Sequence, residues 1–151
     1  MKKSYEIERK FLVSAPPKNL DSYSYHEIEQ GYLCTEPVVR IRRQDDKYYL
    51  TCKSKGLMIR EEYTFPLDEA SYKHLKNKID GRLICKRRYL IPYGIYTIEL
   101  DLFTSPDPDL MLAEVEFPSE EAALSFQAPD WFEEDVTHSS RYHNSRLSQE
   151  I

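Results

Sequence analysis

Apolar and polar residues alternate with a period of two along most of the chain, a pattern typical of β-strands that bury one face. The opening stretch places Ile7 and Phe11 on one face and Glu6, Glu8 and Lys10 on the other. The same alternation recurs between turn signals, so we expect an antiparallel, mainly β fold. The predicted strands cover residues 4–13, 26–35, 38–44, 48–54, 57–67, 84–91, 96–103 and 110–117.

Helical spacing is confined to short segments between and after these strands. Asp68 has the side chain of a helix N-cap and is followed by apolar residues at helical spacing, which predicts a helix over residues 69–78. Ser119 predicts the start of a second short helix, and the tail is expected to end in a third. The sequence has no internal repeat and no linker-like stretch, so residues 1–151 are expected to form one α+β domain.

The polar faces of several predicted strands carry charges of a single sign. Arg40 and Arg42 share one face, whereas Glu114 and Glu116 share another. An open antiparallel sheet with one solvated face is the usual reason for alternation and stays an alternative here. Like charges two residues apart repel each other unless opposite charges lie between them. A closed eight-stranded antiparallel barrel, with basic strands facing acidic strands across a tunnel and a few short helices outside, supplies that arrangement.

A tunnel lined by both signs of charge suits a small polyanion bound together with a divalent metal ion. Arg and Lys bind phosphate oxygens, and Arg does so in bidentate fashion. Carboxylates bind hard cations such as Mg²⁺ or Mn²⁺, which also bridge phosphate groups. Carboxylates alone would repel a phosphate chain, and cations alone would bind it without activating water. The combination favours a metal-dependent reaction of a polyphosphate.

The composition limits the other partners of the protein. The 151 residues carry a formal net charge of −5, which argues against a general binder of nucleic acid or membrane surfaces. No stretch approaches the roughly 18 apolar residues of a membrane span, and the N-terminus lacks the apolar segment of a secretory signal. We therefore expect a small-molecule partner and neither nucleic acid nor membrane, while a homodimer stays open.

The cysteines and histidines show no metal-ligand spacing. Cys34, Cys52 and Cys85 are odd in number and form no C-x-x-C pair, and the four histidines are scattered. This distribution argues against a zinc site. It is typical of reduced thiols, so we expect a cytoplasmic protein.

Short charged motifs follow one another in order along the chain and keep the same strand parity throughout. They are Glu6-x-Glu8-x-Lys10, Gln30-Gly31-Tyr32-Leu33, Arg40-x-Arg42, Thr51-x-Lys53-Ser54, Arg60-x-Glu62, Lys86-x-Arg88-Tyr89, Glu99-x-Asp101, Glu114-x-Glu116-Phe117 and Arg141-Tyr142-x-Asn144. This series resembles the triphosphate tunnel metalloenzymes, also called the CYTH superfamily. The chain is most similar to short bacterial members that cleave inorganic tripolyphosphate.

The resemblance implies a tunnel that holds a triphosphate together with Mg²⁺ or Mn²⁺. It implies that the phosphate chain is bound by Lys10, Arg40, Arg42, Lys53, Arg60, Lys86, Arg88 and Arg141. It implies that the metal is coordinated by Glu6, Glu8, Glu62, Asp101, Glu114 and Glu116. Phosphoryl transfer depends mainly on positioning and charge neutralisation. The implied activity is metal-dependent hydrolysis of inorganic tripolyphosphate.

The catalytic candidates implied by the resemblance are Lys53, Tyr32 and Lys86. Some relatives use a Lys–Tyr pair to handle protons, and Lys53 and Tyr32 occupy the matching positions. A lysine crowded by arginines has a lowered pKa, which suits proton transfer. The alternative is that Lys53 only clamps phosphate and Tyr32 only packs. Arg141 likewise has two interpretations, substrate contact or anchoring of the terminal helix.

Two departures from the family pattern affect these expectations. Thr64 stands where many relatives carry a second glutamate, which puts the second metal site in doubt. Ser140 stands where a basic residue often precedes the Arg-Tyr of the tail. Other functions of the same tunnel stay open: hydrolysis of thiamine triphosphate or of a nucleoside triphosphate, cyclisation of ATP, or polyphosphate binding without catalysis. The many carboxylates argue against the last of these, because a pure anion binder has no use for them.

Overall fold

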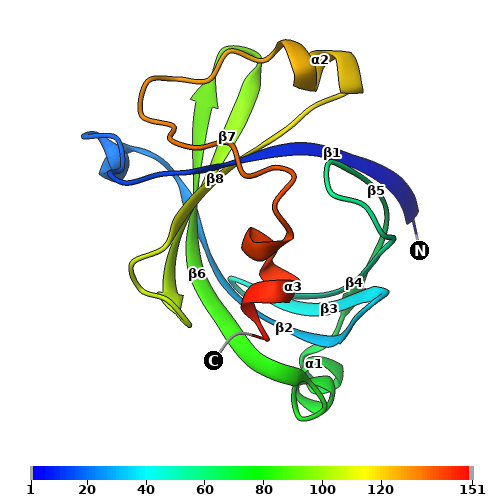
Figure 1. Cartoon of the computed structure of the whole chain (residues 1–151). Helices are drawn as coiled ribbons and strands as arrows, with labels where there is room; N and C mark the ends of the chain where they lie inside the picture. Colours follow the sequence, from blue (N-terminus) through cyan, green and yellow to red (C-terminus); the bar gives the residue numbers. More distant parts are fainter. Residues whose placement is uncertain (1, 150–151) are drawn as a thin grey trace.

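The predicted strands form a closed antiparallel barrel (Figure 1). The computed structural model describes residues 2–149, with side chains from Tyr5 onward. The strands are β1 (Lys2–Leu12), β2 (Tyr25–Thr35), β3 (Val38–Gln44), β4 (Lys47–Lys53), β5 (Ile59–Leu67), β6 (Asp80–Tyr93), β7 (Tyr96–Ser105) and β8 (Met111–Glu116). Around the barrel they follow the order β1-β5-β4-β3-β2-β6-β7-β8, which returns to β1. The predicted fold class is therefore confirmed.

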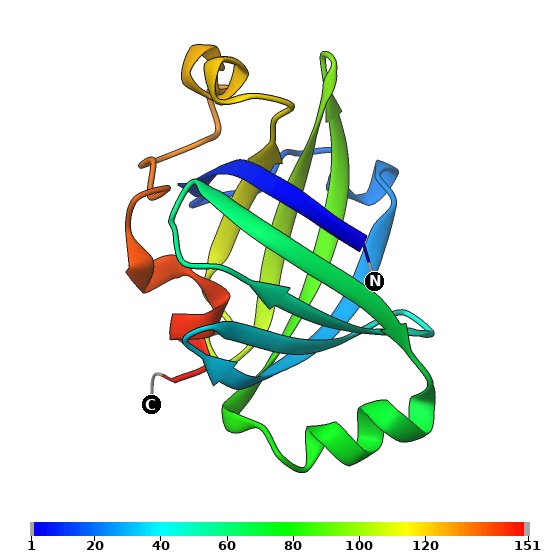
Figure 2. The same ribbon diagram turned by 90° about the vertical axis from the view of Figure 1, so that its right-hand side faces the viewer.

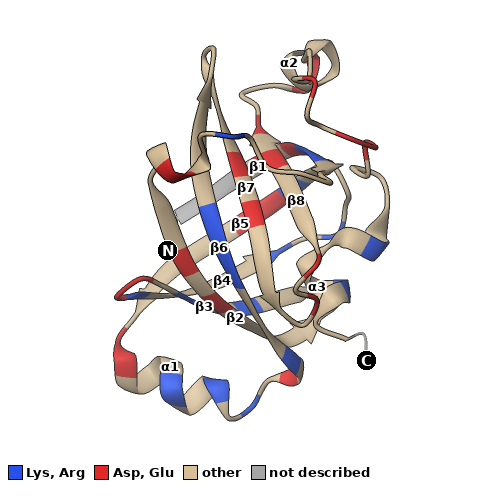
Figure 3. Ribbon diagram, turned by 90° about the vertical axis from the view of Figure 1, so that its left-hand side faces the viewer, with Lys and Arg blue, Asp and Glu red and all other residues tan. Residues whose placement is uncertain are grey.

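Strand register brings opposite charges together on the inner face of the barrel. Arg88 of β6 stands opposite Asp101 of β7, and Figure 3 shows the basic band of β6 beside the acidic band of β7. Other opposed pairs are Glu6 with Arg60, Lys53 with Glu62, and Lys10 with Glu114. The register also sets Glu8 directly opposite Glu116, a like-charge pair that destabilises a sheet unless a cation intervenes.

Most of the hydrophobic core lies outside the barrel wall. A cluster of aromatic and aliphatic residues packs between the outer faces of β1, β6, β7 and β8 and the segment that follows β8. Within it the rings of Phe11 and Phe132 lie 4.7 Å apart, and those of Phe117 and Phe126 lie 5.2 Å apart. Burial of these side chains removes apolar surface from water and stabilises the barrel, while the middle of the lumen stays polar.

A second, smaller apolar cluster fills one end of the lumen. It contains Ile84, Phe103 and Leu112 from the barrel wall and Leu147 from the tail. These wall residues have the same strand parity as the charged inner residues, so the lumen changes from polar to apolar toward this end. The tail is thereby anchored inside the barrel.

The helices are short and lie outside the strands or across one opening. The helix α1 (Glu69–Lys76) begins where Asp68 accepts a hydrogen bond from the Ser71 N–H at 2.7 Å, and it ends two residues before the predicted boundary. The helix α2 (Glu120–Ser125) begins at the predicted N-cap, Ser119. A 3₁₀ turn, η1 (Leu20–Ser22), lies in the loop after β1. None of the helices among residues 2–149 combines the length and apolar character needed to cross a bilayer.

The C-terminal tail crosses one opening of the barrel (Figures 1 and 2). It includes a 3₁₀ turn, η2 (Ser140–Tyr142), and the helix α3 (Asn144–Leu147). Before these turns the tail pairs with β1, since the Val136 N–H donates to the Lys10 carbonyl at 2.8 Å. This pairing and the buried Leu147 fix the tail at the tunnel end, which places tail residues beside the charged lumen.

Candidate functional site

A charged cavity of about 190 Å³ occupies the lumen. All eight strands and the tail contribute to its wall. The lining residues are Glu6, Glu8, Lys10, Tyr32, Val38, Arg40, Arg42, Lys53, Arg60, Glu62, Arg88, Glu99, Glu114, Glu116, His143, Asn144 and Ser145. Most of the predicted site residues are therefore brought together, and the exceptions are Lys86, Asp101 and Arg141.

Three glutamates form a compact acidic cluster on one side of the cavity. One carboxylate oxygen from each of Glu6, Glu8 and Glu116 lies within 4.8 Å of the others. Burial and the neighbouring Glu114 and Glu6 raise the pKa of Glu8 well above its usual value. Burial, together with nearby carboxylates, raises the pKa of Glu116 to about 7. Oxygen ligands this close suit a hard divalent cation, which would remove their mutual repulsion.

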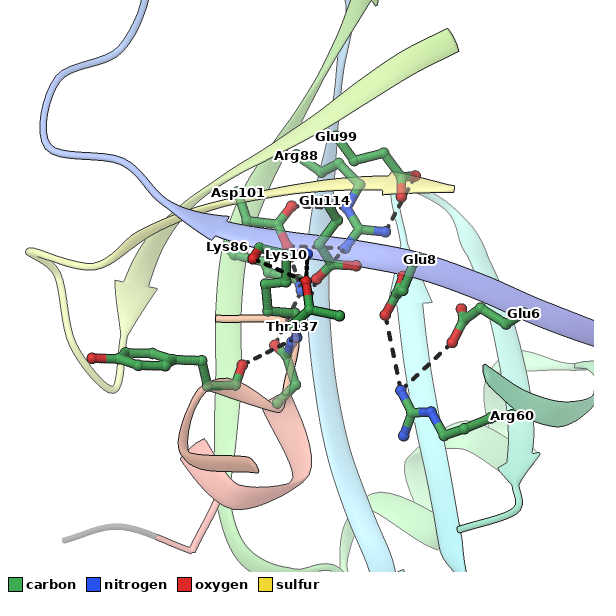
Figure 4. A network of polar contacts seen from close by, with 12 residues as sticks. Glu6, Glu8, Lys10, Arg60, Lys86, Arg88, Glu99, Asp101, Glu114 and Thr137 are labelled. Atoms are coloured by element: carbon green, nitrogen blue, oxygen red, sulfur yellow. Dashed lines mark hydrogen bonds and ion pairs between the residues drawn. The ribbon is translucent and has the colours of Figure 1, made fainter. Parts of the chain in front are cut away.

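Glu6 links this acidic cluster to the basic residues of the wall (Figure 4). Its carboxylate lies 2.9 Å from the Lys53 ammonium and 3.5 Å from the Arg60 guanidinium. Burial opposes ionisation of Glu6, but the two cations outweigh it and hold the pKa at about 2. Glu62 lies farther from Lys53, at 3.8 Å, and accepts a hydrogen bond from Thr64 at 3.4 Å. The hydroxyl of Thr64, the residue noted above as a departure from the expected pattern, thus contacts the Glu62 carboxylate.

Asp101 does not belong to the acidic cluster. Its side chain is fully buried and does not line the cavity. The Asp101 carboxylate oxygens lie 2.7 Å from the Lys86 ammonium and 2.8 and 2.9 Å from two nitrogens of Arg88 (Figure 4). Burial would raise the pKa of Asp101, but Arg88 and Lys86 lower it below its usual value. The implied role of Asp101 as a metal ligand thus finds no geometry to support it, because its oxygens are used by two cations.

Lys86 lies beneath the cavity floor and not in its lining. Its ammonium contacts Asp101 and donates to Asn144 Oδ1 at 3.1 Å, and the same oxygen accepts a hydrogen bond from Gln30. Burial, with the nearby Arg88 and Arg42, lowers the pKa of Lys86 to about 7. The structure therefore places Lys86 as a support for the floor and for the tail residue Asn144.

Arg40 and Arg42 differ from the other cations of the wall. Among the described residues no carboxylate lies within ion-pair distance of either guanidinium, whereas Lys10, Lys53, Arg60 and Arg88 each have a carboxylate partner. The Arg40 Nε is buried without a hydrogen-bond partner. Burial and the charges of Arg40 and Arg88 lower the pKa of Arg42 to about 9. Unpaired donors in a lumen are suited to an anionic ligand.

Lys53 and Tyr32 both line the cavity, but the contacts of Lys53 are with acidic residues. Its ammonium donates to both oxygens of Glu6 and lies near Glu62. Burial and nearby arginines lower the pKa of Lys53. Tyr32 is buried on the cavity wall. The two residues share the site, and their action as a pair stays a prediction.

Sequence reasoning missed His143 and did not assign Glu99 a role. His143, the variable position of the Arg141-Tyr142-x-Asn144 motif, lines the cavity, and burial with the nearby Lys10 and Arg60 lowers its pKa to about 4. Glu99 also lines the cavity, 3.4 Å from Arg88. Arg141, in contrast, is exposed and lies over the Tyr142 ring. Inward strand parity had indicated Glu99, whereas no strand pattern covers the tail.

Comparisons with known proteins agree with this geometry. The CYTH domain family matches residues 4–150 of the chain. An inorganic triphosphatase of Nitrosomonas europaea is 40% identical over 153 residues, covering 97% of this chain and 98% of that protein. An inorganic triphosphatase of Acetivibrio thermocellus is 38% identical over 148 residues, covering 94% and 92%. The crystal structure of the inorganic triphosphatase NE1496 superposes with a TM-score of 0.70 at 38% identity and covers 97% of this chain and 95% of that one.

Proposed function

Because the chain belongs to the CYTH domain family, we propose that residues 1–151 form a single tunnel domain that hydrolyses inorganic tripolyphosphate with Mg²⁺ or Mn²⁺ as cofactor. The main observation behind this proposal is that three adjacent carboxylates and several Lys and Arg side chains line the same closed lumen. Two full-length relatives that are inorganic triphosphatases support it.

The arginines without carboxylate partners bind the phosphate chain. Arg40 and Arg42 offer guanidinium donors on the cavity wall, among them the buried Nε of Arg40, and phosphate oxygens match the geometry of such groups. Four further cations line the same cavity and add positive charge, although each is also ion-paired with a carboxylate. They are Lys10, Lys53, Arg60 and Arg88. Arg141 lies outside the cavity and is exposed over the ring of the adjacent Tyr142, so we leave it out of the proposed phosphate-binding set.

The acidic cluster fits the implied divalent cation. Glu6, Glu8 and Glu116 offer three converging oxygen donors. Burial and neighbouring carboxylates raise the pKa of Glu8 and of Glu116, and a bound cation would favour their ionised forms. Members of this family depend on metal ions. A bound Mg²⁺ or Mn²⁺ supplies charge neutralisation at the phosphate oxygens and makes water more acidic. Glu62 and Glu114 complete the acidic wall.

The protein contributes position and electrostatics to the hydrolysis itself. Water attacks a terminal phosphorus, and the bond from that phosphorus to the bridging oxygen breaks. Orthophosphate and pyrophosphate leave, and one proton of the water passes to the pyrophosphate or to solvent. Arg40 and Arg42 stabilise the negative charge that develops on the leaving pyrophosphate. Lys53, held by Glu6 on the cavity wall, clamps phosphate at the border between the acidic cluster and the cations. We assign no nucleophilic side chain.

An organic substrate fits this cavity less well than an inorganic one. Among the described lining residues, Tyr32 is the one Tyr, Phe or Trp. Stacking on such rings stabilises a bound thiazolium ring or nucleobase. Thiamine triphosphate, nucleotides and ATP cyclisation therefore rank below tripolyphosphate.

The test is phosphate release from tripolyphosphate, thiamine triphosphate, ATP and pyrophosphate, each with Mg²⁺, with Mn²⁺ and with excess EDTA. We expect tripolyphosphate to be cleaved fastest, and EDTA to abolish release. Faster cleavage of ATP or thiamine triphosphate would replace the substrate assignment. Turnover that persists in EDTA would remove the metal from the mechanism.

We also propose that the protein is cytoplasmic. Cys34, Cys52 and Cys85 are all free. Free thiols are the usual state in a reducing compartment. The three free thiols support a cytoplasmic location, which labelling of all three thiols in freshly lysed cells tests.

A further inference from the structure

A glutamine of β2, Gln30, stands directly opposite Arg42 of β3, and we propose that Gln30 is a positioning residue for phosphate binding. Its uncharged amide fixes the direction of the Arg42 guanidinium and leaves the positive charge of that group to the phosphate chain. The inference deepens the proposed function and rests on it, since it assumes that the lumen binds tripolyphosphate.

Gln30 holds Arg42 by one short hydrogen bond. The Arg42 Nε donates to Gln30 Oε1 at 2.7 Å. A guanidinium carries further N–H groups on its two terminal nitrogens, and this bond leaves them unused. Among the described residues neither terminal nitrogen of Arg42 has a hydrogen-bond partner, and Arg42 lines the central cavity. The terminal nitrogens are therefore the donors that remain for phosphate oxygens.

The orientation of the Gln30 amide is fixed from both ends. The Arg42 Nε can only donate, so the amide oxygen must face it, and the amide nitrogen faces the other way. There Gln30 Nε2 donates to Asn144 Oδ1 at 3.1 Å, and the Lys86 ammonium donates to the same oxygen at 3.1 Å. Lys86 is in turn held 2.7 Å from Asp101. A reversed amide would set donors against donors, so Gln30 is a fixed acceptor for Arg42.

Burial makes this arrangement rigid. Gln30 is fully buried, and the residue opposite it on β6 is the fully buried Ile84, whose side chain offers no hydrogen bond. The amide thus depends on Arg42 and Asn144 for its hydrogen bonds, and a buried amide without partners costs free energy. The fold therefore maintains the bond to Arg42 before any ligand binds.

An amide suits this position better than a carboxylate. A glutamate has the same shape, but its charge would pair with Arg42 and compete with the phosphate chain. Among the described residues Arg42 has no carboxylate partner, unlike four other cations of the cavity wall. These are Lys10, Lys53, Arg60 and Arg88. Gln30 thus gives Arg42 a hydrogen-bond acceptor without neutralising its charge.

The test is a double-mutant cycle on the affinity for tripolyphosphate, measured by calorimetry in metal-free buffer. Gln30→Met removes the acceptor at similar volume and should weaken binding roughly threefold to tenfold, the size of a typical net hydrogen-bond contribution. Arg42→Ala removes the group on which Gln30 acts, so adding Gln30→Met to it should change the affinity by less than about twofold. The same loss in both backgrounds would show that Gln30 acts on the fold and not through Arg42, which overturns the inference.

Gln30→Glu tests the role of charge separately. It keeps the shape of the side chain and an acceptor facing Arg42, so it stays informative where Gln30→Met fails to fold. We expect it to weaken tripolyphosphate binding at least about tenfold, because the new charge pairs with Arg42 and repels phosphate. Wild-type affinity in this variant would overturn the inference. Gln127→Met and Gln127→Glu are the matched controls at an exposed glutamine outside the cavity lining, and both should bind like the wild type.

The outcomes separate this inference from the proposed function. If the wild type hydrolyses tripolyphosphate but the cycle shows no coupling between Gln30 and Arg42, the inference fails and the proposed function stands. If the wild type binds tripolyphosphate without hydrolysing it, the proposed function fails, and the same cycle still decides the inference. A wild type that does not bind tripolyphosphate overturns both.

Discussion

Two carboxylate sites lie on the same inner face of the barrel in opposite electrostatic surroundings. Asp101 lies between Lys86 and Arg88, at 2.7 and 2.8 Å, and these cations lower its pKa. Glu116 lies beside Glu6 and Glu8, and burial with neighbouring carboxylates raises its pKa to about 7. Cations of the protein therefore neutralise Asp101, whereas Glu116 has other carboxylates as its neighbours.

The difference distinguishes a structural carboxylate from a binding one. A buried ion pair that is complete within the fold gains nothing from an external cation, and loss of either partner leaves an unpaired buried charge. A cluster of like charges destabilises the empty protein, and a bound cation relieves that repulsion. The comparison therefore assigns Asp101 to stability and Glu116 to metal-dependent activity.

The largest expected effect is on activity, in the variant Glu116→Gln. Removal of one ligand of the cluster should lower metal-dependent phosphate release by at least about a hundredfold, because loss of even an indirect metal contact commonly costs ten- to a hundredfold. Since a like charge is also removed, the midpoint of thermal unfolding should stay the same or rise. The measurements are phosphate release with Mg²⁺ or Mn²⁺ and thermal unfolding followed by circular dichroism.

Glu134→Gln is the matched control for this prediction. Glu134 is an exposed glutamate of the segment that pairs with β1, so its neutralisation should leave activity unchanged. Near-wild-type turnover of Glu116→Gln would show that the acidic cluster does not hold the metal.

The second prediction reverses the pattern, because Asp101→Asn should mainly lower stability. The substitution leaves Lys86 and Arg88 buried without their shared partner, and breaking such a pair commonly costs about 3–5 kcal/mol. Urea unfolding of the metal-free protein measures the free energy of unfolding. Asp109→Asn, in an exposed loop, is the control and should change it little. If the Asp101→Asn protein is as stable as the wild type but no longer shows metal-dependent phosphate release, Asp101 serves activity and not stability.

Strand parity predicted which residues face the lumen but not what each one meets there. Asp101 and Glu116 look alike in the sequence, and their difference arises from register, which sets Asp101 opposite Arg88 and Glu116 opposite Glu8. Register depends on pairing between distant segments, so alternation within one strand does not reveal it. The closed barrel itself was predictable, because single-sign faces need opposite charges across from them.

The tail was the least predictable part of the site. Leu147 packs inside the barrel against Ile84, and the Val136 N–H donates to the Lys10 carbonyl, contacts that join segments far apart in the sequence. At the tail end of the barrel the inward-facing strand positions change from charged to apolar residues. This change is the sequence signal that an apolar side chain fills that end of the lumen. His143 enters the lumen only because this packing fixes the tail.

The third prediction concerns the cations, which differ among themselves as the carboxylates do. Arg42 has no carboxylate partner among the described residues and donates to the Gln30 side chain at 2.7 Å. Arg42→Ala should weaken tripolyphosphate binding by about 1–3 kcal/mol, the range for a lost charged hydrogen bond. Calorimetry in metal-free buffer measures this change. Arg43→Ala, the adjacent residue of opposite strand parity, should bind tripolyphosphate like the wild type, and equal losses in both variants would place Arg42 outside the binding site.

The smallest expected effect concerns His143, whose surroundings combine the cations Lys10, Lys53 and Arg60 with the carboxylate of Glu114. Burial and the nearby cations lower its pKa to about 4, whereas the unfolded value is about 6.5. Between these values the unfolded chain takes up a proton that the folded protein does not, so stability falls as the pH falls from about 6.5 to about 4.

His143→Gln removes this titration, so the variant should lose less stability than the wild type over that pH range. The imidazole is partly open to water in the cavity, which reduces the expected difference to roughly 1 kcal/mol. Urea unfolding at pH 7, 6, 5 and 4 measures it, with His138→Gln as the control at an exposed histidine. Parallel pH profiles for the wild type and His143→Gln would mean that the Glu114 carboxylate offsets the three cations, and that the tail end of the lumen is nearer to neutral than its central wall.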